Sequence, residues 1–462
     1  MTLREKYIGD GAFYKRMFAV ALPMIIQNGI TNFVSLLDNI MIGQVGTVQM
    51  NGVSIANQLM FVFYMAIFGA VSGAGIFTAQ YYGKGDRVMV RNTFRFKVLS
   101  CLVLTALGAA IFYFFGPQLI SLYLQGEGDP REAAQSLSYG YAYTKVMLVG
   151  LPAFAMTSAY GGTLRETDEG VVPMVAGICA VVVNLVLNYV LIFGHLGAPA
   201  LGAVGAAWAT VASRYVEAGI VMVWTHRNPC RAAFIQGAFR SLRIPAGLFR
   251  SILRRGAPLM LNEILWSSGV AIQSQCYTVR SLDVVAAANI ANTVSNLASV
   301  VFLALGAAVG ILMGQMQGAG YTAQALRREN RKMVFACMVG SVVFGVAMLL
   351  VSGLFPMLYN TTDQVRSLST VLICILALVK PFGGYCNAAY YSLRSGGRTG
   401  VTFLFDCVFM WALAVPLALY LSQFTDLPII PLYGIIQGLE ILKCVAGFYI
   451  LKSGIWIKNL TE

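Results

Sequence analysis

Long runs of apolar residues recur along the whole chain and are separated by short polar segments. Many of these runs exceed about 18 residues, which is enough for a helix to cross roughly 30 Å of hydrocarbon. The runs are apolar on all faces, whereas strands of a membrane β-barrel alternate apolar and polar positions over about ten residues. The pattern therefore predicts an all-α membrane protein.

Twelve runs are expected to be transmembrane helices, at residues 17–43, 52–80, 96–116, 137–160, 171–194, 202–225, 250–279, 285–316, 333–355, 367–393, 399–421 and 432–451. The first run follows a short basic segment, and no A-x-A-like cleavage site precedes the next polar loop. We therefore expect the first run to be a retained span.

The second half of the chain repeats the first. At an offset of 235 residues the identities are Pro23/Pro258, Ile55/Ile290, Asn57/Asn292, Gly75/Gly310, Ile76/Ile311, Gln80/Gln315, Gly83/Gly318 and Gly85/Gly320. An offset of 229 aligns Pro152 with Pro381 and Leu164-Arg165 with Leu393-Arg394.

This repeat predicts two pseudo-repeated lobes of six helices each, residues 1–225 and 250–462, joined by a basic cytoplasmic linker at 226–249. Because six is an even number, both lobes enter the membrane in the same direction. Parallel repeats of this kind place a substrate cavity between the lobes and rock one lobe against the other. The architecture favours a transporter over a receptor or a membrane enzyme.

Composition and charge support this topology. The chain is 58% hydrophobic and 11% charged, where a soluble domain has about 25% charged residues. With a cytoplasmic N-terminus, 25 of the 32 lysines and arginines fall in inner segments, and the outer loops hold only Arg131, Arg280 and Arg366. The positive-inside rule predicts a multi-pass plasma-membrane protein with both termini in the cytoplasm. The net charge of +13 is then a topology signal, and no nucleic-acid partner is expected.

Metal-binding and catalytic residue types are sparse. The nine cysteines are scattered singly without a C-x-x-C pair, and the two histidines, His195 and His226, fall in loops on opposite faces. These spacings argue against a disulfide framework, a structural metal or a histidine-based active site. We expect a monomer that is not an enzyme and has no cofactor.

Several segments resemble the multidrug and toxic compound extrusion (MATE) family. They are residues 37–43 (LDNIMIG), residues 75–86 (GIFTAQYYGKGD), and Asn184-x-x-x-Asn188-Tyr189 followed by Gly197-x-Pro199-x-Leu201-Gly202. Glu263 after Pro258, and Asp406 before Trp411 and Pro416, continue the likeness. It extends from about residue 15 to 455 and implies two six-helix lobes facing each other in a V. It also implies export of small cationic or amphipathic molecules across the lipid bilayer, coupled to inward flow of Na⁺ or H⁺.

Polar residues in the first half gather at one depth. Asp38 is about five residues, or roughly 8 Å, from the outer end of its span, and Asn184 and Asn188 lie four apart on one helix face. Thr210 has a similar depth. Carboxylate, amide and hydroxyl oxygens are ligands that a weakly bound Na⁺ prefers, and the carboxylate could bind a proton instead. We predict a coupling site here, guided for the amides and Thr210 by the family resemblance; the alternative is interhelical hydrogen bonding.

The second half carries Glu263 and Lys380 near the middle of their spans and Asp406 about two turns into span 399–421. Two acids and one base predict a buried pair plus a spare carboxylate that binds protons or substrate. Both acids resemble functional carboxylates of the family, although the second is placed differently among subfamilies. The alternative is a fixed salt bridge between Lys380 and one of the acids.

Other features are expected to be structural. Arg214 with Glu217 and Glu440 with Lys443 lie three apart and predict pairs along single helices. Pro152 and Pro381 mark matched sites where helices bend. An exporter of lipid-linked or other amphipathic metabolites is the alternative function, because related folds move such cargo. A cavity lined with arginines would favour this alternative. The predominance of acids instead favours cationic or neutral apolar cargo.

Overall fold

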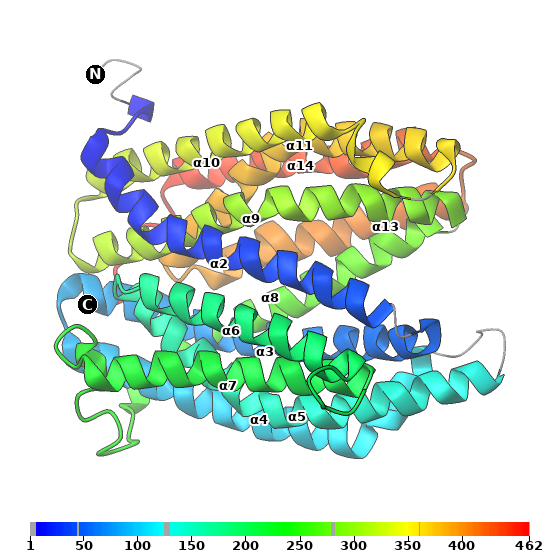
Figure 1. Cartoon of the computed structure of the whole chain (residues 1–462). Coiled ribbons are helices and arrows are strands. Elements are labelled where there is room, and N and C mark those ends of the chain that lie inside the picture. Colours follow the sequence, from blue (N-terminus) through cyan, green and yellow to red (C-terminus); the bar gives the residue numbers. More distant parts are fainter. Residues whose placement is uncertain (1–5, 44–45, 124–129, 279–281, 360, 462) are drawn as a thin grey trace. The chain divides into compact units, whose positions relative to one another are not determined.

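The computed structural model describes residues 6–43, 46–123, 130–278, 282–359 and 361–461 (Figure 1). The described residues form helices and loops without a strand. The long helices are α2 (Gly11–Gly43), α3 (Thr47–Lys84), α4 (Arg87–Tyr123), α5 (Pro130–Glu166), α6 (Val171–Phe193), α7 (Ala203–Arg227), α8 (Ala246–Thr278), α9 (Leu282–Gly318), α10 (Ala323–Val351), α11 (Asp363–Ser395) and α14 (Ile429–Ser453). Between α11 and α14, the chain forms α12 (Thr399–Phe403), two π-helical turns (Leu404–Val408 and Met410–Ala414) and α13 (Val415–Gln423).

Each predicted span corresponds to one of these helical segments, with the run 399–421 divided among α12, the π-helical turns and α13. Among the described residues, ten segments are long and apolar enough to cross a membrane. The other two predicted spans are α7 and α8. Their central polar residues, Arg214 and Glu217 on α7 and Asn262 and Glu263 on α8, lower the local hydropathy. The expected all-helical membrane fold is confirmed.

The repeat is visible in the backbone at two helix ends. Gly85 after α3 and Gly320 after α9 both have φ of +78°, a conformation that costs a residue with a Cβ atom but not glycine. The two glycines are repeat mates, since 320 minus 85 is the offset of 235. Matching sequence therefore produces matching helix ends.

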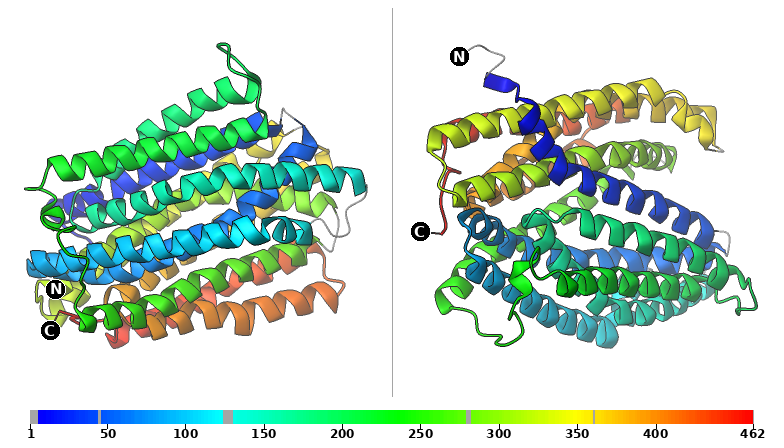
Figure 2. Two further views of the ribbon diagram at one scale, coloured as in Figure 1. Left: turned by 90° about the horizontal axis from the view of Figure 1, so that it is seen from below. Right: turned by 60° about the vertical axis from the view of Figure 1, so that its left-hand side comes forward.

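The chain divides into two compact units. Unit 2 comprises Ile26–Thr78 and Asp86–Met260. Within it α5 packs against α4 and α7, and α6 packs against α7 (Figure 2). Glycine allows close approach, because a Cβ on Gly73 would overlap Gly256, and one on Gly52 would overlap Gly140. Small residues at contacts are how membrane helices gain close van der Waals contact.

Unit 1 comprises Met1–Ile25, Ala79–Gly85 and Leu261–Glu462. Its central element is α11, which packs against α9, α10 and α14 (Figure 1). The core of this unit is lined by small and branched side chains, including Ala308, Leu312, Cys337, Ala388 and Leu393. These small and branched side chains let α9, α10 and α11 pack closely.

The compact units exchange helix ends relative to the sequence repeat. Residues 79–85 of α3 belong to unit 1, and residues 246–260 of α8 belong to unit 2. The predicted division into 1–225, 226–249 and 250–462 follows the repeat. The units differ from it because α2, α3 and α8 each continue from one unit into the other.

The basic linker is anchored to the helices of unit 2. It contains a 3-10 turn, η1 (Ala233–Ile235), whose buried Phe234 ring lies 5.0 Å from the ring of Phe94 on α4. Arg95 donates from Nε to the carbonyl of Ala238 at 2.7 Å and from Nη2 to that of Gly237 at 2.8 Å. The linker is therefore a packed segment of unit 2.

Candidate functional site

Four predicted polar residues meet inside unit 2. Helix α2 supplies Asp38, α6 supplies Asn184 and Asn188, and α7 supplies Thr210. The amide of Asn188 donates to Asp38 Oδ1 at 2.5 Å and to Asn184 Oδ1 at 3.1 Å. Asn184 in turn donates to Thr210 Oγ1 at 3.4 Å. The predicted residues form one connected cluster, because α6 presents both amides on the face that receives α2 and α7.

The two amides of the cluster are buried, Asp38 and Thr210 are partly buried, and the cluster has an unused acceptor. Asn188 is fully buried, and its Oδ1 has no hydrogen-bond partner among the described residues. A buried polar atom without a partner costs about 1–3 kcal/mol. An unsatisfied oxygen beside a carboxylate is therefore a site at which a proton donor or a cation would be stabilised.

The orientation of the Asn184 amide leads to the same conclusion. In the structure its Oδ1 accepts from Asn188 but faces the two Asp38 carboxylate oxygens, 3.1 and 3.3 Å away. Turning the amide over lets it donate to Asp38 but brings its nitrogen 3.1 Å from Asn188 Nδ2, another donor. With Oδ1 of Asn184 facing Asp38, three acceptor oxygens lie together. A proton on Asp38, or a cation among these oxygens, removes this repulsion.

An ion pair lies on α7 next to this cluster. Arg214 Nη1 and Glu217 Oε2 are 3.0 Å apart, and Gln27 Nε2 donates to Glu217 Oε1 at 3.5 Å. The predicted pair three residues apart is confirmed. Arg214 also lies 5.5 Å from the centre of the Phe154 ring, so the guanidinium is held by both a carboxylate and an aromatic face.

A second polar cluster occupies unit 1. Tyr390 Oη on α11 donates to Glu263 Oε1 on α8 at 2.8 Å, and Arg394 Nη1 lies 3.4 Å from the same oxygen. The Arg394 side chain is 5% exposed and that of Glu263 is 15% exposed. Glu263 is thus a buried carboxylate with a buried guanidinium beside it.

Asp406 belongs to the same cluster and lies in the first π-helical turn, Leu404–Val408. Lys443 Nζ on α14 lies 2.6 Å from Asp406 Oδ1, and Asn262 Nδ2 donates to Asp406 Oδ2 at 3.0 Å. Asn262 also donates to Tyr390 Oη at 3.4 Å. Hydrogen bonds therefore connect Glu263 to Asp406 through a tyrosine and an amide.

Comparison with known proteins adds the family. The sequence model of the MatE family matches residues 23–190 and 258–421. This chain belongs to the MatE family. The two matches begin at Pro23 and Pro258, the residues that start the internal repeat. Thr210 and Lys443 lie outside the matched segments, so their place in the clusters comes from this structure.

Relatives cover nearly the whole MatE chain. The probable multidrug resistance protein NorM of Thermotoga maritima is 24% identical over 457 residues, which is 96% of this chain and 93% of that protein. The probable multidrug resistance protein YoeA of Bacillus subtilis is 25% identical and covers 90% of this chain and 89% of its own. A crystal structure of MATE in complex with MaL6 superposes with a TM-score of 0.84 at 18% identity, over 98% of both chains.

Lys380 is separate from both acids of this MatE protein. Its Nζ donates to Ser295 Oγ at 2.7 Å, to the Ser295 carbonyl at 3.1 Å and to Ser299 Oγ at 2.8 Å. Both the predicted pair with a spare carboxylate and the alternative salt bridge from Lys380 are therefore wrong, because Arg394 lies beside Glu263 and Lys443 beside Asp406. Lys380 instead lies where α11 faces the serines of α9, whereas Tyr390 and Arg394, further along α11, contact Glu263.

The predicted pair of Glu440 with Lys443 does not form a salt bridge, although Glu440 lies close enough to interact with Lys443 electrostatically. Lys443 points across to Asp406 on another segment, and Glu440 Oε2 has no hydrogen-bond partner among the described residues. A buried carboxylate on a neighbouring helix, with an amide completing its hydrogen bonds, outcompetes a pairing along one helix face.

Sequence reasoning missed Asn262, Tyr390 and Arg394. Arg394 was counted as a cytoplasmic charge because it precedes the short segment 396–398, yet it is buried. The repeat offered a signal that Arg394 has a structural role, because the same Leu-Arg dipeptide occurs at the matched helix end, as Leu164-Arg165. The buried pair of Lys97 with Glu166 was missed for the same reason.

Proposed function

We propose that this MatE protein is a secondary active multidrug efflux antiporter that exports organic cations or amphipathic toxic compounds in exchange for Na⁺ or H⁺. Family membership and the multidrug resistance names of its relatives support the transport class. We also propose that the protein crosses the plasma membrane several times, has both termini in the cytoplasm and has no catalytic site.

The cluster around Asp38 carries the coupling proposal. A carboxylate, two amides and a hydroxyl converge there, and the contact between Asn184 and Asp38 is unfavourable unless Asp38 is protonated or a cation lies among the oxygens. Either event neutralises the carboxylate and tightens the contact between α2 and α6. The bound and empty states therefore favour different arrangements of α2, which is the requirement for coupling an ion to a conformational change.

The cluster around Glu263 and Asp406 is the proposed second site, for protons or cationic substrate. Both acids are balanced by bases, Arg394 and Lys443. A proton or an organic cation that neutralises either acid leaves one of these bases uncompensated, so the hydrogen bonds through Tyr390 and Asn262 must rearrange. Lys380, hydrogen-bonded to serines of α9 away from both acids, is proposed as a second charge of unit 1 that repels or orients cationic cargo.

The test is efflux of a fluorescent organic cation from proteoliposomes under separately imposed Na⁺ and pH gradients. We expect one of the gradients to drive export by wild-type protein. Asp38→Asn should abolish gradient-driven export while leaving the protein folded, because the amide mimics a permanently neutral carboxyl group. Asp363→Asn is the matched control, since that side chain is 97% exposed.

Wild-type flux in Asp38→Asn would reduce Asp38 to a structural residue. If neither gradient drives efflux of any organic cation by folded wild-type protein, the antiporter proposal fails. The related alternative, export of lipid-linked or other amphipathic metabolites, would then be tested with the same vesicles.

A further inference from the structure

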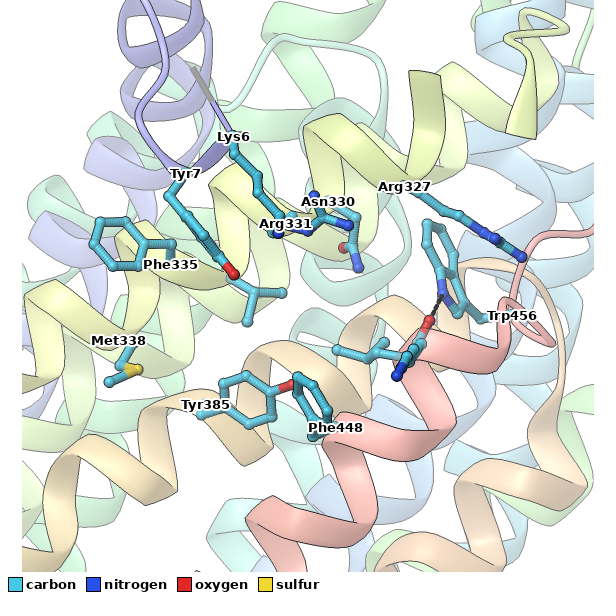
Figure 3. Close-up of a pocket in the computed structure, with 13 residues that line it drawn as sticks. Lys6, Tyr7, Arg327, Asn330, Arg331, Phe335, Met338, Tyr385, Phe448 and Trp456 are labelled. Atoms are coloured by element: carbon cyan, nitrogen blue, oxygen red, sulfur yellow. Dashed lines mark hydrogen bonds between the residues drawn. The ribbon is translucent and has the colours of Figure 1, made fainter. Parts of the chain in front are cut away.

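A cavity of about 470 Å³ lies within unit 1 between α10, α14 and the segment before α2 (Figure 3). Helix α11 packs against both α10 and α14 and contributes Tyr385 to the lining. Lys6 and Tyr7 line the cavity from the N-terminal side. The cavity is separate from the two polar clusters described above and shares no residue with them.

The lining is cationic at one end and apolar at the other. Along α10, Arg327, Arg331, Phe335 and Met338 follow one another at helical spacing on one face, over a length of about 16 Å. Along α14, which contributes Lys452 and Phe448, the same order recurs from the end of the helix inward. Figure 3 shows Lys6, Arg331 and Arg327 on one side of the cavity and Met338, Tyr385 and Phe448 on the other.

The positive charge of this cavity is not compensated by its own lining. Among the described residues, the lining includes four bases, namely Lys6, Arg327, Arg331 and Lys452, and no carboxylate. A neighbouring cavity that α10 also lines differs, because there Arg328 and Lys332 both pair with Glu329. The bases on one face of α10 therefore share a carboxylate of the protein, whereas those on the other are left for an external anion.

The apolar end of the cavity is open to the surroundings of the protein. Met338 is 39% exposed and Phe448 is 52% exposed, and both lie on helices apolar enough to cross a membrane. The basic end lies at the helix ends that the distribution of lysine and arginine predicts to be cytoplasmic. An occupant must therefore combine an anionic group at the membrane surface with a hydrocarbon chain extending inward.

We propose that this cavity binds one anionic phospholipid of the cytoplasmic leaflet. Arg327 and Arg331 hold the headgroup phosphate, with Lys6 and Lys452 on either side of it. Arginine suits this role because its planar fork donates two hydrogen bonds to phosphate oxygens. An acyl chain lies along Phe335, Met338 and Phe448. Because the Tyr7 ring contacts that of Phe335, with centroids 5.6 Å apart and the planes tilted by 52°, the lipid also fixes the segment that leads into α2.

Lipid binding to the purified full-length protein tests the proposal by native mass spectrometry. The probes are a phosphatidylglycerol, a phosphatidylcholine with the same acyl chains, and glycerol 3-phosphate, which has the phosphate without the chains. We expect the wild type to bind the phosphatidylglycerol in preference to both others. Arg327→Gln with Arg331→Gln should weaken this binding about 30-fold, since each basic residue near an anionic lipid contributes roughly fivefold.

The matched control is Arg240→Gln with Arg243→Gln, which removes the same charge from exposed positions in the linker. Phe448→Asn tests the contact with the acyl chain, because it replaces an apolar ring by an amide. It should weaken binding of the phosphatidylglycerol while leaving any binding of glycerol 3-phosphate unchanged. Arg331→Gln alone replaces the double variant if the latter is not recovered as a folded protein.

Equal affinity of the cavity variant and the linker control for phosphatidylglycerol would overturn the proposal. Equally tight binding of glycerol 3-phosphate would also overturn it, in favour of a site for a soluble phosphate. Neither result depends on transport, so the test is independent of the proposed antiport.

Discussion

Buried charged side chains hold helices of this protein together in pairs. Lys97 on α4 contacts Glu166 on α5, and Asp406 contacts Lys443 on α14. Charges inside the apolar region are costly unless they are paired and hydrogen-bonded. Removing one partner of a buried pair typically costs about 3–5 kcal/mol, because the other charge remains buried. The partner of each acid therefore decides what a substitution does.

Glu263→Gln should lower the free energy of unfolding by about 3–5 kcal/mol, because Arg394 loses the carboxylate beside it. Adding Arg394→Met should restore much of the loss, whereas adding Lys380→Met should not. Thermal unfolding of the three variants in detergent, compared with efflux, gives the measurement. Rescue by Lys380→Met instead would show that Lys380 is the energetic partner of Glu263.

Lys443→Met and Lys380→Met form a second comparison between two lysines of unit 1. The first should be strongly destabilising, by about 3–5 kcal/mol, since it leaves Asp406 with Asn262 but without its cation. The second removes a charge held by serine oxygens and should cost clearly less. Thermal unfolding midpoints measured side by side distinguish them, and an equal loss in both variants would contradict the assignment.

The end of α3 contacts the end of α9 at residues that correspond to each other in the internal repeat. A Cβ atom on Gly83 would overlap the carbonyl of Gln315, and one on Gly318 would overlap the carbonyl of Gln80. Both segments belong to unit 1. Gln80 is fully buried and donates to Gln317 Oε1 at 2.9 Å. Glycine at matched positions thus allows two helix backbones to touch around a buried amide network.

Gly83→Ala and Gly318→Ala should each destabilise the protein by about 1–3 kcal/mol, as expected when a group is forced into a filled space. Gly438→Ala on α14 is the control, because a Cβ there meets nothing within 4 Å. It should be neutral or stabilising by up to about 1 kcal/mol, since alanine is the better helix former. Wild-type unfolding midpoints for both Gly83→Ala and Gly318→Ala would mean that the helices separate without cost.

The π-helical turns before α13 also have a local cause. Pro416 lacks a backbone N–H and its ring crowds the carbonyl four residues earlier, so regular hydrogen bonding cannot continue through this point. Two π-helical turns, Leu404–Val408 and Met410–Ala414, precede it. Such turns often occur at functional positions, and here the first of them carries Asp406.

At the scale of the whole molecule, the proposed topology makes a labelling prediction. In a background that keeps Cys230 but lacks the other cysteines, an impermeant thiol reagent should leave intact cells unlabelled. Cys230 is exposed and lies in the basic linker, so it should react only after permeabilisation. A cysteine at the exposed position 363, introduced as Asp363→Cys with Cys230 replaced, should react in intact cells.

The two positions act as internal controls for each other, because each is exposed and each should be labelled from one side only. Reaction of Cys230 in intact cells, together with protection of position 363, would invert the proposed orientation. Transport activity of both variants shows that they are inserted correctly.

The sequence by itself determined the helices, the repeat and the common helix face of Asn184 and Asn188, whereas their meeting with Asp38 and Thr210 was expected from the family resemblance. Apolar run length decides which segments cross a membrane, and residues four apart on α6 share a face whatever surrounds them. Matching glycines produced matching helix ends. These features depend on neighbouring positions in the chain, so they could be predicted without knowing which helices are adjacent.

Only the tertiary structure decided which buried charges are partners. Glu263 lies 131 residues from Arg394, and Asp406 lies 37 residues from Lys443. Which of several bases faces an acid depends on how each helix is rotated and which helix packs beside it, and spacing along the chain carries no information on either. Lys380 therefore pairs with neither acid, Lys443 forms its salt bridge with Asp406 rather than with Glu440, and Arg394, one of the basic residues predicted to lie in inner segments, belongs to the buried cluster.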